Sequence, residues 1–399
     1  MKKLSSILLV ACAAIASAAL LGSCSKTEGG IRLSGPIQFS MASRGGQSTK
    51  TVYGKDVEKD GKKYQALDWE EGDVITIASP QATVQNAATE THASNYVIDQ
   101  VTITGVPSTA TVRNEGANGL AWDENINTYS FYGIYPKQET GVITLTEAGA
   151  VNATIPAAQT LGATSTKSES KTYGEGDAAT TLTVNYTVYA PDMKYAFMTA
   201  ALTDFTATSY DQTVPLEFKP AFTAFEFNVS SQDEPIDLTE FEILSPDADG
   251  KPNPNGDALA GTFSMTAGGD LPTSKPSTAT PSVKVDLSAT AAIDDTNGLT
   301  FTVFTVPVTN TNPLRIRFTS KDGEPETEGG EVPTKTSYLD LKYSNNEAAG
   351  TNAGKAVQFL AGHKYRIHML KLPSSQWKIT IAPEFDEWIQ AEEEIVIYI

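Results

Sequence analysis

Cysteine and histidine are scarce in this chain of 399 residues, which contains two of the former and three of the latter. Cys12 lies inside an apolar leader and Cys24 ends it, so the rest of the chain has no thiol for a disulfide or a thiolate zinc site. The motifs HExxH, GxSxG and GxxxxGK[ST] are also absent, and the three histidines are scattered. Acidic residues are numerous, so a glycosidase pair of carboxylates stays open, but no pair stands out. We therefore expect no enzyme activity and no cofactor.

Basic residues are also few compared with acidic ones. Lys and Arg total 29 against 48 Asp and Glu, a formal charge of −19. A surface of this sign repels nucleic acid, so no nucleic-acid partner is expected. After residue 24 there is no run of about 20 apolar residues, the length that a transmembrane helix needs. No long segment repeats apolar residues at the helical spacing of 3.6 either.

The first 24 residues have the pattern of a secretory leader. Lys2 and Lys3 precede an apolar run from Ile7 to Leu21, and small residues follow. The ending, Leu21–Cys24, resembles the bacterial lipobox, in which the Cys thiol is acylated and the chain is cut before it. The alternative is an ordinary cleavage site with a cysteine nearby. We expect residues 1–23 to be removed and Cys24 to hold the chain to a membrane through its acyl chains.

Residues 25–35 are small, polar and glycine-rich and are predicted to form a flexible tether, and a short strand and an exposed loop follow it. Ile37, Phe39 and Met41 alternate with polar or small residues, which places one apolar face on a strand. The following loop, 43–49, is small, polar and glycine-containing, and such loops are accessible to proteases. Arg44 is its basic residue, and an ordinary loop arginine is the simpler interpretation of it.

The rest of the chain has the composition of strands and turns. Thr, Val, Ile, Tyr and Phe recur in short runs that Gly and Pro interrupt, which predicts an all-β protein with two β-sandwiches. Residues 163–179 have almost nothing to bury and are predicted to form a surface loop. A linker is expected at 202–212. The predicted division is leader 1–23, tether and first strand 24–44, first domain 45–207 and second domain 208–399.

One loop is the best candidate for a metal site, although no metal is expected. Its oxygen-bearing side chains could suit calcium, but the spacing does not match an EF-hand. A turn-rich loop is the alternative. The candidate ligands are Asp247, Asp249, Asn253, Asn255 and Asp257.

The end of the chain repeats the pattern of the first strand. Ile395, Ile397 and Ile399 recur at every second position after a run of glutamates. An edge strand of its own sandwich is one interpretation of this segment, and a strand donated to another subunit is the other. Trp122 is the one candidate for stacking against a sugar ring.

Several modest signals follow one another in an order that resembles the fimbrillin family, the lipoprotein pilin precursors of certain Gram-negative bacteria. The resemblance covers nearly the whole chain but no single motif is highly specific. One position departs from it, because Pro220 stands where many relatives have His. The signals are Leu21–Cys24, Ile37–Met41 with Arg44, Trp69–Asp73 before Val74–Ile77, Tyr129–Pro136, Asp192–Ala196, Leu216–Phe218, Lys364–Leu372, Ile379–Ile381 and Trp388.

The resemblance implies a mechanism as well as transthyretin-like sandwich domains. An Arg-specific surface protease would cut between Arg44 and Gly45, and the first strand would leave with its lipid. A terminal strand of the next subunit would fill the vacancy, so the partners would be other pilus subunits. The chain would be an outer-membrane lipoprotein precursor and then part of a surface fimbrium that supports adhesion. The alternatives are a non-polymerising surface lipoprotein that binds glycan or host protein, and an anchor or tip subunit.

Overall fold

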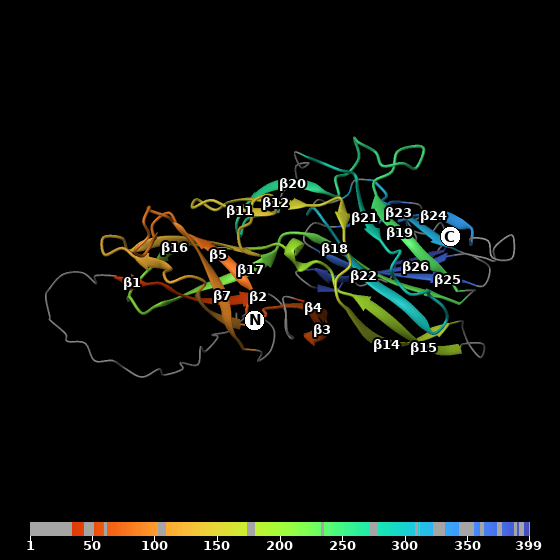
Figure 1. Ribbon diagram of the computed structural model, residues 1–399, viewed down its shortest axis with the longest axis horizontal. Helices are drawn as coiled ribbons and strands as arrows, with labels where there is room; N and C mark the ends of the chain where they lie inside the picture. Colours follow the sequence, from red (N-terminus) through yellow and green to blue (C-terminus); the bar gives the residue numbers. More distant parts are fainter. Residues whose placement is uncertain are drawn as a thin grey trace, which may run out of the picture.

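The fold is built from β-strands in two connected halves (Figure 1). The only helix in the described part of the chain is a short 3-10 turn, η2 (Met193–Tyr195), so the all-β prediction is confirmed. No helix in these residues is long and apolar enough to cross a membrane. A computed structural model describes residues 34–43, 52–59, 62–102, 109–173, 180–232, 235–271, 278–307, 310, 312–321, 332–342, 355–359, 363–372, 377–386, 389–390 and 395–398.

A closed barrel, where the sequence predicted a first β-sandwich, forms the half drawn on the left of Figure 1. Its strands alternate inward and outward residues: in β17, for example, Val214, Leu216 and Phe218 are buried between exposed neighbours. Closure leaves the sheet without a free edge. Around the barrel the order is β10 (Thr128–Tyr135), β16 (Met198–Thr206), β17 (Thr213–Pro220), β2 (Gln38–Ser43), β8 (Thr109–Asn114), β7 (Ala93–Thr102) and β5 (Val74–Ala78).

One small sheet accompanies the barrel, formed by β1 (Gly35–Pro36), β9 (Leu120–Trp122) and β6 (Thr83–Val84). A separate hairpin of β3 (Val52–Lys59) and β4 (Lys62–Asp68) contacts the other half of the molecule, where β4 lies against strands β26 (Trp377–Asp386) and β27 (Ile389–Gln390).

The half on the right of Figure 1 is a sandwich of two sheets whose aromatic side chains meet between them. Phe241 packs on Phe227 and Phe301, with ring centroids 4.4 and 4.9 Å apart. One sheet has the order β13 (Ala158–Gln159), β21 (Ser282–Asp286), β19 (Asp237–Leu244), β23 (Arg315–Lys321) and β24 (Thr334–Asp340). The other runs β14 (Thr164–Tyr173), β15 (Thr180–Tyr189), β22 (Asn297–Thr305), β18 (Thr223–Ser231), β25 (Lys364–Lys371), β26 (Trp377–Asp386) and β27 (Ile389–Gln390), with β28 (Ile395–Tyr398) also on β26.

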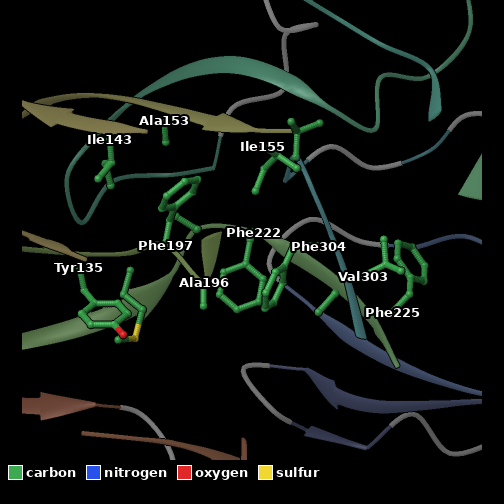
Figure 2. Packing of buried hydrophobic residues seen from close by; sticks show 14 of the residues in the cluster. Tyr135, Ile143, Ala153, Ile155, Ala196, Phe197, Phe222, Phe225, Val303 and Phe304 are labelled. Atoms are coloured by element: carbon green, nitrogen blue, oxygen red, sulfur yellow. The ribbon is translucent and has the colours of Figure 1, made fainter. Parts of the chain in front are cut away.

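One continuous core joins the two halves. Phe197 contacts Phe263 with ring centroids 6.3 Å apart, and Phe222 contacts Phe304 at 5.0 Å. Figure 2 shows Phe197, Phe222 and Phe304 in a layer of buried side chains between the halves. The sheet of β11 (Ile143–Leu145), β12 (Ala150–Ile155) and β20 (Gly261–Thr266) lies along the same junction (Figure 1).

Strands from both sides of residue 207 share sheets. β17 belongs to the barrel, β12 pairs with β20, and β15 pairs with β22 in parallel. The division into 45–207 and 208–399 stays a prediction about folding units. The linker expected at 202–212 does not separate two units, because β16, which runs to Thr206, and β17, which begins at Thr213, are paired neighbours in the same barrel.

The prediction of a surface loop at 163–179 is wrong for most of its length. Residues 164–173 form β14, which pairs with β15 at every position from Thr164 to Tyr173. Its Ser, Thr, Lys and Glu residues offer little to bury, but a ladder needs only backbone N–H and C=O groups. An edge strand can therefore form from a sequence without an apolar face.

Candidate functional site: the groove filled by strand β2

Strand β2 pairs with a barrel strand on each side, and these two neighbours come from distant parts of the chain. It runs parallel to β17, with Phe39 opposite Val214 and Met41 opposite Leu216. It runs antiparallel to β8, where Met41 lies opposite Ala110. Removal of β2 would therefore leave an open slot between the exposed edges of β17 and β8.

The side chains of this segment alternate between the barrel interior and solvent. Ile37, Phe39 and Met41 are 4%, 3% and 1% exposed. Gln38 is exposed, and Ser40 is half-buried. The apolar face contributes to the barrel core and would leave three adjacent vacancies if the strand departed.

Aromatic rings form the walls around Phe39. Its ring meets Tyr96 and Phe131 edge to face, with centroids 5.1 and 5.4 Å apart. The Tyr96 hydroxyl accepts a hydrogen bond from the Leu120 N–H at 2.8 Å, and burial raises the pKa of that hydroxyl. The Ile37 N–H donates to the Leu120 carbonyl at 2.8 Å. Leu120 of β9 therefore binds both Ile37, which precedes β2, and Tyr96, which contacts Phe39.

Trp122 belongs to this core, and its interpretation as a sugar-stacking residue is wrong. It is 5% exposed, and its ring contacts Tyr129 edge to face with centroids 4.9 Å apart. Its Nε1–H donates to the Tyr210 carbonyl at 3.0 Å. A ring enclosed in this way cannot stack on a saccharide, which weakens the glycan-binding alternative.

The terminal strand β28 lies at a sheet edge. It pairs antiparallel with β26, placing Ile395 opposite Ile381 and Ile397 opposite Ile379. Among the described strands β26 is its only partner. Ile399 lies outside the described residues.

Three further predicted site residues also lie outside the part of the chain that the structure describes. They are the lipidation candidate Cys24 and the two residues of the expected cut, Arg44 and Gly45. Their predicted roles stay predictions. The description of β2 ends at Ser43, immediately before Arg44.

The loop proposed for calcium uses its oxygen atoms in turns. Asp247 Oδ1 accepts the backbone N–H groups of Asp249 and Lys251 at 2.9 and 2.8 Å. Asn253 Oδ1 accepts the N–H of Asn255 at 3.0 Å. Asp257 Oδ2 accepts a backbone N–H from residue 312 at 3.0 Å. No group of three or more His, Cys, Asp and Glu side chains in the described residues is arranged to hold a metal ion.

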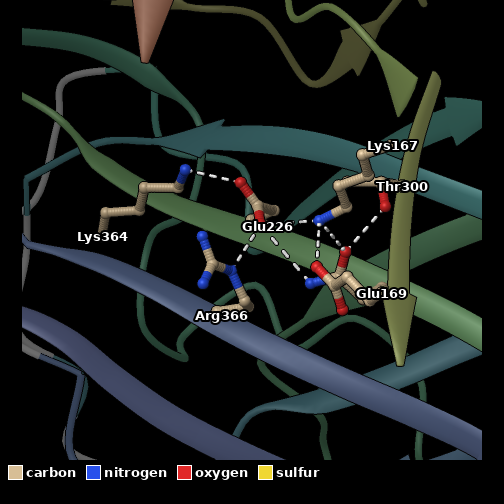
Figure 3. A network of polar contacts seen from close by, with 7 residues as sticks. Lys167, Glu169, Glu226, Thr300, Lys364 and Arg366 are labelled. Atoms are coloured by element: carbon tan, nitrogen blue, oxygen red, sulfur yellow. Dashed lines mark hydrogen bonds and ion pairs between the residues drawn. The ribbon is translucent and has the colours of Figure 1, made fainter. Parts of the chain in front are cut away.

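A buried charged cluster escaped the sequence analysis. Glu226 of β18 pairs with Lys364 and Arg366 of β25 at 2.6 Å each, and lies 4.0 Å from Lys167 of β14 (Figure 3). Burial alone would raise the pKa of the Glu226 carboxyl, but the charges of Lys364, Arg366 and Lys167 hold that pKa well below its usual range. Alternation along β18 predicts that Glu226 faces away from the apolar side, but only the parallel register with β25 shows that cations cover it.

No family model and no curated protein matches this sequence. Among solved structures, the chain is similar to a "putative cell adhesion protein" from Bacteroides uniformis (14% identity, TM-score 0.45, 90% of this chain and 98% of that one). It is also similar to a fimbrial assembly protein from Parabacteroides distasonis (10% identity, TM-score 0.40, 92% and 99%). A third is the tip fimbrial protein Mfa3 from Porphyromonas gingivalis (8% identity, TM-score 0.33, 91% and 98%).

Proposed function

We propose that this chain is a structural subunit of a surface pilus that is exported as a lipoprotein, cut after Arg44 and polymerised by strand exchange. The observation that carries the proposal is the position of β2. It pairs on both sides within a closed barrel, and its apolar face is buried. It ends at Ser43, and the expected cut follows the next residue, Arg44. A cut there would free a strand that the barrel needs.

The energetics favour replacement of that strand over an open slot. Burial of each large apolar side chain is worth about 1.5–3 kcal/mol. Ile37, Phe39 and Met41 together would therefore contribute about 5–9 kcal/mol, before the entropy of ordering the strand is subtracted. The backbone groups of β17 and β8 that now pair with β2 would also lose their partners. An extended segment with large residues at every second position restores both kinds of contact.

The terminal strand has the properties of such a segment. Ile395, Ile397 and Ile399 repeat at the period of Ile37, Phe39 and Met41. β28 is held at a sheet edge, and its partner β26 lies in the opposite half of the molecule from the barrel (Figure 1). A donor at one end and a groove at the other produce head-to-tail contacts that do not close, and such contacts form filaments.

The wider proposal covers architecture and location. The two halves correspond to transthyretin-like domains, the lipid on Cys24 holds the precursor at the outer membrane, and an Arg-specific surface protease releases it into a fimbrium that supports adhesion. Its partners are other pilus subunits. Its role is structural, without catalysis.

Mass spectrometry of assembled material tests the cut. We expect a new N-terminus at Gly45, which the Arg44→Ala variant should lack. Arg113→Ala, which alters an exposed arginine on β8, is the matched control and should keep the cut. Assembled protein that begins only at Cys24 would contradict the proposal.

Electron microscopy of cells that express the chain with and without residues 392–399 tests donation of the tail. We expect fibres only with the complete chain. Fibres of normal length and number from the truncated chain would refute the role of β28.

A further inference from the structure

A lysine and an asparagine from different strands meet beside the Glu226 carboxylate. Lys167 Nζ, from β14, donates a hydrogen bond to Asn228 Oδ1, on β18, at 2.9 Å. Thr300 Oγ1, on β22, donates to the same oxygen at 2.6 Å. The Asn228 amide nitrogen, Nδ2, donates to Glu226 Oε1 at 3.4 Å. The amide is therefore oriented, with its oxygen towards an amine and a hydroxyl and its nitrogen towards a carboxylate.

We propose that Lys167 and Asn228 become joined by an amide bond between Lys167 Nζ and Asn228 Cγ, with release of ammonia. The reaction converts a lysine ammonium and a primary amide into a secondary amide and an ammonium ion, so atoms and charge balance. One C–N bond forms and one breaks, and no oxidant, reductant or cofactor takes part.

The neighbouring groups fit the separate steps. Glu169, 3.0 Å from Lys167 Nζ, accepts a proton and frees the lone pair that attacks Cγ. The Thr300 hydroxyl stays hydrogen-bonded to Oδ1 as that oxygen gains negative charge. Glu226 Oε1 lies 4.0 Å from Lys167 Nζ and binds Nδ2. This contact orients the amide. After the attack on Cγ, the second proton of the attacking amine passes to the departing nitrogen, which leaves as ammonia and takes up the proton held by Glu169.

The surroundings favour the product. Asn228 is fully buried, so its carbonyl is shielded from competing water. The charged side chains shown together in Figure 3 are three cations, Lys167, Lys364 and Arg366, and two carboxylates, Glu169 and Glu226. Loss of the Lys167 charge would leave two of each sign.

The cross-link would tie an edge of the sheet to its centre. β14 is the outermost strand of the large sheet, separated from β18 by β15 and β22. A filament subunit bears tension, and this chain has no cysteine after Cys24 with which to form a disulfide. An amide across these strands supplies a covalent constraint of the same kind. The inference does not depend on assembly and holds for the monomer.

Peptide mapping by mass spectrometry of the purified full chain tests the bond. We expect a linked pair of peptides, one containing Lys167 and the other Asn228, whose mass is the sum of the two minus one ammonia. Lys167→Arg keeps the positive charge but removes the primary amine, and should release both peptides at their sequence masses. Lys284→Arg alters a lysine that pairs with exposed Glu240, and should keep the linked pair.

Two results would overturn the proposal. The first is folded wild-type protein in which both peptides stay separate at their sequence masses after prolonged incubation. The second is loss of ammonia at Asn228 in the Lys167→Arg variant too, because that would indicate cyclisation of the asparagine without the lysine.

Thr300→Val, which retains the shape of the side chain, should slow formation of the linked pair several-fold.

Discussion

At the scale of single residues, Phe39 has the largest side chain that β2 places in the barrel. It is 3% exposed and touches Tyr96 and Phe131. We expect Phe39→Ala to lower the free energy of unfolding of the uncut chain by about 3–5 kcal/mol, because it removes buried area and leaves a cavity. Denaturation in urea measures this change. Gln38→Ala, on the exposed face of the same strand, should change it by less than about 0.5 kcal/mol, and equal effects of the two variants would contradict the described packing.

Glu226 offers a test that depends on pH. Its folded-state pKa is held below its usual value, so the stability that it contributes is complete above the unfolded-state pKa of about 4.3 and is lost as pH falls through the folded-state pKa. We expect Glu226→Gln to cost about 3–5 kcal/mol at neutral pH, because Lys364 would keep a buried charge without its carboxylate. The cost should shrink below about pH 4.

Both proteins for this measurement should carry Lys167→Arg, so that the proposed amide cannot form in either. Glu240→Gln, at a carboxylate that is 47% exposed, is the control in the same background. A cost that is equal at pH 7 and in strong acid would show that Glu226 is not ionised in the folded chain.

At the scale of elements, β2 can be supplied as a separate peptide. A chain that begins at Gly45 should bind a peptide of residues 34–43 in the slot between β17 and β8. Phe39→Ser in the peptide should weaken binding about 10- to 100-fold, since burying this ring is worth about 1.5–3 kcal/mol. Fluorescence anisotropy measures both affinities. Gln38→Ser in the peptide is the control, and equal loss from both changes would show that binding does not use the groove.

The strands of the sandwich show how pairing can override composition. β14 pairs with β15 along its whole length although its residues offer little to bury. It also brings Lys167 to Asn228. The sequence of 163–179 alone favours a loop, because a ladder formed by the backbone leaves no hydrophobic signal in the side chains.

At the scale of the whole molecule, the chain from Gly45 onward has 24 Lys and Arg against 47 Asp and Glu, and its formal charge of −23 opposes approach of one copy to another. If cut subunits assemble head to tail, added salt should accelerate elongation several-fold, because the Debye length falls from about 30 Å at 0.01 M to about 8 Å at 0.15 M. Light scattering by chains that begin at Gly45 measures the rate. The Arg44→Ala chain, which keeps β2, should stay monomeric at every salt concentration. A rate that falls with salt would indicate assembly through attraction between opposite charges.

The sequence by itself determined the class of structure and the faces of its strands. An all-β fold, the inward side of Ile37, Phe39 and Met41, and the lack of thiols for disulfides all follow from residue type and from the two-residue period of a strand. These properties are local, so they can be read along the chain.

Tertiary structure alone decided which segments meet. It placed β2 beside β17, buried Trp122 in a core of rings, covered Glu226 with cations and set Lys167 against Asn228. Lys167 and Asn228 are 61 residues apart in the sequence, and Glu226 and Lys364 are 138 residues apart. Such contacts depend on strand order and register, because a shift of one residue in pairing moves every side chain to the opposite face of the sheet.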